Sequence, residues 1–75
     1  MFYEDGQIVM LDDFVDLGGG MTGKVVGLIE QNKYTEGYSG DDWGYLKIGV
    51  VVNTEVAGTI HYPESHVDFV LIKRA

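Results

Sequence analysis

Glycine is the feature that most constrains the fold of this chain. Eleven of its 75 residues are glycine, spread from Gly6 to Gly58. Because glycine weakens a helix interior by about 1 kcal/mol relative to alanine, and no window keeps a helical apolar stripe free of it, long helices are disfavoured. The apolar residues gather in short runs between Gly, Asp, Asn and Ser, a pattern typical of strands and turns. The sequence therefore predicts an all-β fold with no helix longer than about two turns.

The length of the chain limits it to one domain, residues 1–75. A domain of this size buries about 60–65% of the surface that its unfolded chain exposes, so its stability is modest. The chain has no cysteine, which excludes disulfides and thiolate metal sites. Acidic residues near the start and the lack of a long apolar run argue against a signal peptide and a membrane span, so we expect a soluble, cytoplasmic protein.

Five apolar runs bounded by turn signals are the expected strands. In the third run, Leu46, Ile48 and Val50 alternate with other residues and predict one inward face. Pro63 ends the fourth run because proline offers no ladder hydrogen bond. Short strands of this kind favour a small barrel, since closure removes exposed sheet edges. The expected strands are residues 6–11, 24–30, 45–52, 59–62 and 67–73.

The connections and the core follow from the same pattern. Residues 12–21 and 31–44 are expected loops, and residues 14–17 form at most one helical turn. The expected core consists of apolar residues on the inward faces of the strands: Ile8, Val26, Leu28, Leu46, Ile48, Val50, Ile60, Val67 and Phe69.

The order of these segments resembles a five-stranded SH3-like barrel. Gly6–Val9 followed by Thr22–Val26 looks like the KOW pattern, in which a glycine before the second strand permits a sharp turn. Trp43, Gly58–Ile60 and Pro63–Val67 are similar to the final third of SH3 domains, where a tryptophan begins the third strand. The resemblance implies an SH3-like barrel, with an OB-like barrel or a β-sandwich fragment as the alternative.

The chain departs from these families at the residues that would carry their activities. His66 stands where the peptide groove of SH3 domains has a tyrosine, and the ALYDY stretch of that groove is absent. KOW domains that bind RNA or polymerase are usually basic, and this chain is acidic. The resemblance therefore implies a fold and no specific activity. A short, acidic barrel without cysteine also resembles small accessory proteins encoded by phages and mobile elements.

The charge of the chain is negative and unevenly distributed. The formal net charge is −7, and residues 1–45 hold nine of the twelve acidic residues but two of the five basic ones. This balance argues against binding to a phosphate backbone, which needs several Lys or Arg on one surface. It is consistent with simple solubility or with an acidic face that docks on a basic partner.

One segment imitates a nucleotide-binding motif. Residues 18–24 satisfy the G-x-x-x-x-G-K start of a phosphate-binding loop. The motif then needs Ser or Thr as a magnesium ligand, but Val25 stands there. It also needs a following helix, whereas the residues from Lys24 onward favour a strand. We expect no nucleotide or other cofactor.

The remaining polar residues do not form a recognisable catalytic or metal site. His61 and His66 lie five residues apart with Glu64 and Asp68 nearby, across an expected strand end and a turn. A catalytic zinc site usually needs three protein ligands that converge in tight geometry. The acid pairs 12–13 and 41–42 lack calcium-loop spacing. The sequence predicts no bound metal and no enzyme.

The segment from Lys33 to Tyr45 is unusually rich in aromatic residues for a loop. It holds Tyr34, Tyr38, Trp43 and Tyr45 together with three acids. Tyrosine and tryptophan are enriched at the energetic centres of protein interfaces. The alternative is that these rings cover a small core, and the sequence leaves both open.

These observations favour a non-catalytic protein-binding module. Its partner is expected to be a protein with a basic surface, neither nucleic acid nor membrane, and the oligomeric state stays open, with a homo-oligomer among the outcomes. The alternative is an inhibitor that imitates nucleic acid and presents its aspartates to a DNA- or RNA-binding enzyme. The candidate contact residues are Tyr34, Tyr38, Asp41, Asp42, Trp43, Tyr45, Asp12, Asp13 and Asp16.

Overall fold

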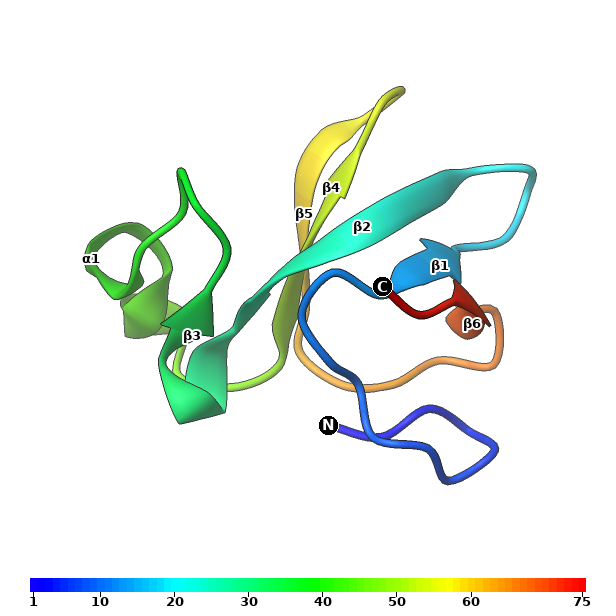
Figure 1. Ribbon diagram of the computed structural model, residues 1–75, viewed down its shortest axis with the longest axis horizontal. Helices are drawn as coiled ribbons and strands as arrows, with labels where there is room; N and C mark the ends of the chain where they lie inside the picture. Colours follow the sequence, from blue (N-terminus) through cyan, green and yellow to red (C-terminus); the bar gives the residue numbers. More distant parts are fainter.

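The computed structural model describes all 75 residues, Met1–Ala75, and is built around one antiparallel sheet of short strands (Figure 1). The all-β class predicted from the sequence is confirmed. None of the helices is long and apolar enough to cross a membrane. The strands are β1 (Phe14–Asp16), β2 (Thr22–Leu28), β3 (Lys33–Tyr34), β4 (Val50–Thr54), β5 (Gly58–Tyr62) and β6 (Val70–Lys73). The short helices are η1 (Ile29–Gln31), α1 (Gly40–Trp43) and η2 (Gly44–Leu46).

The sheet is open and does not close into a barrel. Its strand order is β5-β4-β2-β1-β6, with β3 paired to the end of β2, so β5 and β6 are edge strands. Pro63 follows β5 and cannot donate to a ladder, and β6 has only four residues. Aromatic rings fill the open side instead: Phe69 packs 5.5 Å from Tyr3 and 5.1 Å from Tyr62, measured between ring centroids. The expected closure by hydrogen bonds was wrong.

The first strand lies later in the chain than expected. Residues 6–11 contribute only an isolated bridge between Phe2 and Ile8, while β1 forms inside the expected loop. Val15 is fully buried and pairs with Gly23 of β2, so residues 14–17 do not form a helical turn. A strand of three residues flanked by acids and a glycine run carries too little periodicity to stand out.

The third expected strand is also displaced toward the C-terminus. Residues 44–46 form the 3-10 helix η2, and β4 begins at Val50. Gly49 has a φ of +87°, and a side chain there would collide with the backbone of Tyr62 and Pro63. The chain therefore turns sharply before β4, which removes Ile48 from the strand and leaves it about half exposed.

The core consists of two clusters on opposite faces of the sheet. Val50 and Val52 of β4 face the larger cluster, whereas Val51 between them faces the smaller one, because successive side chains of a strand point to opposite faces. The larger cluster contains Tyr3, Val9, Val15, Leu17, Val25, Leu28, Val50, Val52 and Phe69. The smaller contains Val26, Ile29 and Val51.

The expected core is partly correct. Residues 25–28 and 50–52 are buried in adjacent positions, as in strands that are covered on both faces. Near the N-terminus the inward residue is Val9 rather than Ile8. This shift of one residue exchanges the inward and outward sides of the segment. Of the expected core residues, Val26, Leu28, Val50 and Phe69 are buried, Leu46 and Ile60 are half-buried, and Ile8, Ile48 and Val67 are exposed.

Candidate functional site

The segment between β3 and β4 forms a small projecting lobe, which we call the outer lobe (residues 35–48). It contains α1 and η2 and lies at one end of the sheet, away from β1 and β6 (Figure 1). The candidate aromatic residues of the sequence lie in this lobe or, in the case of Tyr34, on β3 beside it. The outer lobe therefore brings together five of the nine expected contact residues, with Tyr34 beside it.

The inner side of the outer lobe covers the smaller core cluster. Tyr38, Trp43 and Leu46 are half-buried and pack on that cluster. Tyr34 lies against Gly27 of β2, where any side chain would come within 2.8 Å of the tyrosine ring. The hydroxyl of Tyr34 is buried without a hydrogen-bond partner. These three aromatic rings therefore cover the sheet, which matches the core-cover alternative for this part of the segment.

The outer side of the lobe presents one aromatic ring and two acids to solvent. The side chain of Tyr45 is 73% exposed, and Asp41 and Asp42 are exposed as well. Because α1 continues directly into η2, Tyr45 follows the two aspartates by three and four residues, the spacing of neighbours on one helix face. Ser39 Oγ donates a hydrogen bond of 3.4 Å to Asp42 Oδ2. The outward surface is thus a tyrosine flanked by carboxylates.

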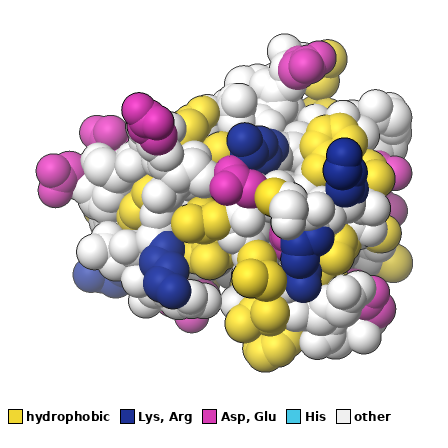
Figure 2. Space-filling view, in the orientation of Figure 1, with side chains coloured by type: hydrophobic (Ala, Val, Ile, Leu, Met, Phe, Trp, Pro, Cys, Tyr) yellow, Lys and Arg dark blue, Asp and Glu magenta, His cyan; other side chains and the backbone are white.

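The aspartates near β1 do not extend this surface. Asp13 is fully buried, so its expected role as a contact residue is wrong. Asp12 Oδ1 lies 3.3 Å from Lys24 Nζ, and Asp16 Oδ1 accepts a 2.8 Å hydrogen bond from the Gly18 amide. Figure 2 shows Asp and Glu side chains scattered over this face rather than gathered in a stripe.

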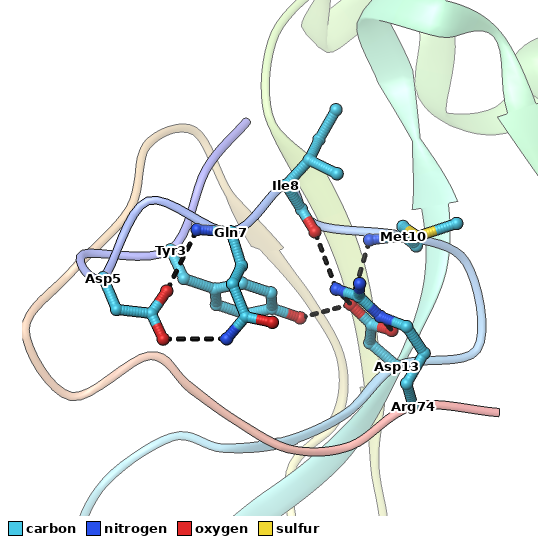
Figure 3. A network of polar contacts seen from close by, with 7 residues as sticks. All are labelled: Tyr3, Asp5, Gln7, Ile8, Met10, Asp13 and Arg74. Carbon is cyan, nitrogen blue, oxygen red and sulfur yellow. Dashed lines mark hydrogen bonds and ion pairs between the residues drawn. The ribbon is translucent and has the colours of Figure 1, made fainter.

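Asp13 is the centre of a buried polar network (Figure 3). Its Oδ2 accepts hydrogen bonds from the Tyr3 hydroxyl at 2.6 Å and from the Met10 amide at 3.0 Å. Arg74 Nε donates to Asp13 Oδ1 at 3.0 Å, and Arg74 Nη2 also donates to the Ile8 carbonyl at 2.8 Å. The network joins the N-terminal segment, the residue before β1 and the end of the chain after β6.

The titration of this network follows from its contacts. Burial of Asp13 opposes its charge, but hydrogen bonds from Arg74, Tyr3 and Met10 outweigh burial and lower the pKa of the carboxyl. Burial, together with the hydrogen bond to Asp13, raises the pKa of Tyr3 well above its usual range. The hydrogen bond to Asp13 likewise raises the pKa of Arg74. These shifts favour a charged Asp13, a neutral Tyr3 and a charged Arg74, as in a structural ion pair.

The glycine run forms a tight turn between β1 and β2. Gly18, Gly19 and Gly20 have φ angles of +88°, +60° and +83°, a conformation that side chains rarely tolerate. The turn is closed by a 2.8 Å hydrogen bond from the Leu17 amide to the Met21 carbonyl. The run therefore serves backbone geometry, and the strand β2 follows it where a phosphate-binding loop would need a helix.

The two histidines make separate contacts. His61 Nε2 lies 2.8 Å from the Ile48 carbonyl, and His66 Nδ1 accepts a 3.2 Å hydrogen bond from the Asp68 amide. No three His, Asp or Glu side chains converge in a way that suits a metal ion. Their positions are explained by local turn and strand contacts.

One surface feature was missed by the sequence interpretation. A mainly apolar pocket lies beside the N-terminal segment, and Gln31 and Lys33 are the polar residues of its lining. The run from Ile8 to Leu11 was assigned to a core strand, yet Ile8 and Met10 are exposed at the pocket. Ile8 and Met10 are exposed because Val9, one residue away, is the buried residue. A run of four consecutive apolar residues does not reveal which alternate set faces inward.

Comparisons of the chain with protein-family models, with curated proteins and with solved structures found no match. Among the surfaces of the molecule, the outward side of the outer lobe is the one where an exposed aromatic ring stands on a helical support with charged neighbours.

Proposed function

We propose that the chain is a non-catalytic protein-binding module whose contact surface is the outward side of the outer lobe. The observation that carries the proposal is the position of Tyr45, which is largely exposed although the helical turns that hold it are fixed by Trp43 against the sheet. A tyrosine presented in this way offers apolar area and a hydroxyl at a small entropic cost, because it has few rotatable bonds and a supported backbone.

The neighbours of Tyr45 define the chemistry of the partner. Asp41 and Asp42 flank the ring, and the half-exposed Ile48 extends the apolar area of the lobe. A complementary surface has an apolar pocket for the ring and Lys or Arg at its rim. Charges at such a rim set the orientation and the association rate, while the buried ring supplies most of the affinity.

The contacts of the titratable groups support a non-catalytic role. Asp13, Tyr3 and Arg74 have clearly shifted pKa values, and their polar atoms bind one another or the backbone. Because Asp13 is fully buried, a substrate in solvent has no access to its carboxylate. Shifted groups of this kind are as typical of structural ion pairs as of active sites.

We also propose that the fold is a variant of the SH3-like class. Three features support it: β2, β4 and β5 form an antiparallel meander, β1 pairs with β2, and β6 returns to pair with β1. A role as a cytoplasmic accessory protein of a phage or mobile element belongs to the same proposal, and small size, acidity and lack of cysteine support it.

The proposal is tested by affinity capture with matched variants. Tyr45→Ala removes the exposed ring, and Val56→Ala is the control because Val56 is equally exposed but lies in the turn between β4 and β5. The immobilised proteins are exposed to a lysate of the native cell, and the retained partner is identified by mass spectrometry. We expect Tyr45→Ala to weaken binding by about 30-fold or more, as an anchor residue does, and Val56→Ala to bind like the wild type.

Salt separates this mechanism from nucleic-acid mimicry. A surface anchored by Tyr45 loses little affinity between about 0.05 and 0.3 M salt, whereas binding through exposed charges falls steeply as screening increases. The double change Asp41→Asn with Asp42→Asn is compared with Tyr45→Ala at both salt concentrations. Strong salt dependence, with binding lost in the aspartate variant and kept in Tyr45→Ala, would refute the aromatic anchor and favour the mimic.

A further inference from the structure

The N-terminal hairpin (residues 1–9) lies beside the sheet and shares no backbone hydrogen bond with the rest of the chain (Figure 1). The chain joins the sheet at Asp12, whose amide donates to the Val25 carbonyl at 2.9 Å. Between the two lies a short linker (residues 10–11). The backbone bonds of the hairpin are internal and run from the Tyr3, Gly6 and Val9 amides to the Gln7, Tyr3 and Met1 carbonyls.

Two buried side chains anchor the hairpin in the larger core cluster. Tyr3 and Val9 belong to that cluster, and the Tyr3 ring stacks on Phe69 with 5.5 Å between the ring centroids. The apolar side chains next to them point outward, because Phe2 and Ile8 are both exposed. The apolar contact of the hairpin with the sheet therefore depends mainly on two side chains.

A pocket lies on each side of this contact. One, with a volume of about 270 Å³, is lined by residues 8–11 and, across from them, by Leu28, Gln31 and Lys33. The other, of about 130 Å³, lies between residues 3–5 and residues 69–71. Since protein interiors are close-packed, hollows on both sides indicate that the hairpin meets the sheet along a narrow contact.

The buried polar contacts of the hairpin converge on Asp13 and Arg74 (Figure 3). The Tyr3 hydroxyl donates to Asp13 Oδ2 at 2.6 Å, and Arg74 Nη2 donates to the Ile8 carbonyl at 2.8 Å. Asp13 and Arg74 both lie outside the hairpin and are bonded to each other at 3.0 Å. Their ion pair therefore does not require the hairpin to be in place.

We propose that the N-terminal hairpin is a lid that opens as a unit about the linker while the sheet stays folded, and that the hydrogen bond from the Tyr3 hydroxyl to Asp13 holds it closed. The buried carboxylate of Asp13 keeps Arg74 as its cation in the open form. Opening uncovers Phe69 and the part of the larger cluster beneath Tyr3 and Val9, an apolar surface that the closed form hides.

Native-state hydrogen exchange in the full chain tests the lid. An isolated two-stranded hairpin is marginally stable at best in water, so the Tyr3 and Val9 amides exchange when the lid opens. We expect these two amides to share one opening free energy, lower than that of the Val25 amide, which donates to the Asp13 carbonyl. This opening free energy is also expected to depend less on urea, because opening the lid exposes less surface than global unfolding.

A matched pair of variants tests the hydrogen bond that holds the lid closed. Tyr3→Phe removes the hydroxyl and keeps the ring. We expect it to lower the exchange protection of the Val9 amide by about 10-fold or more, since hydrogen bonds to charged groups are the stronger ones. Tyr62→Phe is the control, because Tyr62 also packs on Phe69 but lies on β5, and it is expected to leave the protection of Val9 unchanged.

A weaker contact provides a second control. Ser65→Ala removes the exposed 3.1 Å hydrogen bond from Ser65 Oγ to Glu4 Oε2 and is expected to change the protection of Val9 by less than about 3-fold. A loss of protection larger than that in Tyr3→Phe would contradict the assigned role of the Tyr3 hydroxyl. An unchanged Val9 amide in Tyr3→Phe would contradict it as well.

The wild type alone decides whether the lid exists, so this test does not depend on the folding of any variant. If the Tyr3 and Val9 amides share the opening free energy and the urea dependence of the Val25 amide, the hairpin opens only with the whole domain and the proposal is wrong. Unequal opening free energies at Tyr3 and Val9 would also overturn it, because they indicate fraying rather than the opening of one unit.

Discussion

The two core clusters of this domain differ in size and in what holds them together. The larger cluster has nine buried residues drawn from the N-terminal segment, the strands β1, β2 and β4, the residue after β1 and the residue before β6. The smaller cluster has three buried residues and is covered by half-buried side chains of the outer lobe. Burial of apolar area is the dominant stabilising contribution, so the stability of the domain resides mainly in the larger cluster.

Polar contacts increase the difference between the clusters. The Asp13 network ties both ends of the chain to the larger cluster through Tyr3 and Arg74. Within the outer lobe the backbone bonds are short-range, such as those from the Asp42 and Trp43 amides to the Ser39 carbonyl, and the lobe is bonded to the sheet near its two ends, through the Thr35 amide to the Val26 carbonyl and through the Ile48 carbonyl to His61 Nε2. We therefore expect the outer lobe to open at a lower free energy than the sheet.

The largest effect is expected from truncation in the larger cluster. Phe69 is buried and packs on Tyr3 and Tyr62 across the open side of the sheet. Phe69→Ala is expected to lower the free energy of unfolding by about 3–5 kcal/mol, which is most of the stability of a domain of this size. Phe2→Ala, the same change at an exposed position, serves as the control in urea denaturation and is expected to cost less than about 1 kcal/mol.

A somewhat smaller loss is expected when the buried carboxylate of Asp13 loses its cation. Arg74→Ala leaves the buried carboxylate without its cation, while Tyr3 and Met10 still donate to it, so we expect a clear fall in the free energy of unfolding that stays below the loss at Phe69. The adjacent Lys73→Ala is the control in the same denaturation experiment. Equal melting temperatures for the two variants would show that the network contributes nothing.

The same network predicts how stability depends on pH. The pKa of Asp13 is lowered in the folded state, so its contribution is present above the unfolded value of about 4 and is lost as the pH falls further. The pKa of Tyr3 is raised, so its contribution is present below about 10 and is lost at higher pH. Asp13→Asn is expected to flatten the acid side of the profile. Thermal melts between pH 2 and 11, taken at steps of about one unit, measure both limits.

Truncation in the smaller cluster is expected to cost less. Trp43 is half-buried on the outer lobe, and Trp43→Ala is expected to lower the free energy of unfolding by about 2 kcal/mol, below the loss at Phe69. Tyr45→Ala in the same helical segment is the control and is expected to change stability by about 0.5 kcal/mol or less. A loss at Trp43 equal to that at Phe69 would mean that the clusters form one cooperative core.

The smallest effect is expected at Ile48. The sequence placed Ile48 in the core, where Ile48→Ala would cost about 2–5 kcal/mol, but the structure leaves it half exposed after η2. We now expect a loss of about 1 kcal/mol or less, measured by urea denaturation. A fall in the free energy of unfolding within the range expected for a core residue would show that Ile48 is buried.

Local patterns explain which parts of the fold were predictable. The expected strands at residues 24–30, 59–62 and 67–73 overlap β2, β5 and β6, because β-branched runs between turn residues carry a clear signal. The strand β1 was missed, since three residues show no period. The start of β4 was misplaced because alternation continued through Leu46 and Ile48, which the positive φ of Gly49 separates from the strand.

Contacts between distant residues explain what the sequence did not reveal about the candidate site. Asp13 looks like a loop charge, yet it is paired with Arg74, which is 61 residues away. No local pattern signals such a partner. The division of the outer lobe, with Trp43 inward and Tyr45 outward, depends on how α1 docks on the strand that contains Val51. The aromatic content of the segment was visible in the sequence, but the direction of each ring was not.

Native-state hydrogen exchange tests the separation of the two clusters most directly. The Asp42, Trp43 and Lys47 amides report on the outer lobe, and the Leu17 and Val25 amides, bonded to the Met21 and Asp13 carbonyls, report on the sheet. We predict lower opening free energies for the lobe amides than for the sheet amides, and a further decrease at the lobe in Trp43→Ala. A single opening free energy shared by both sets would contradict the account.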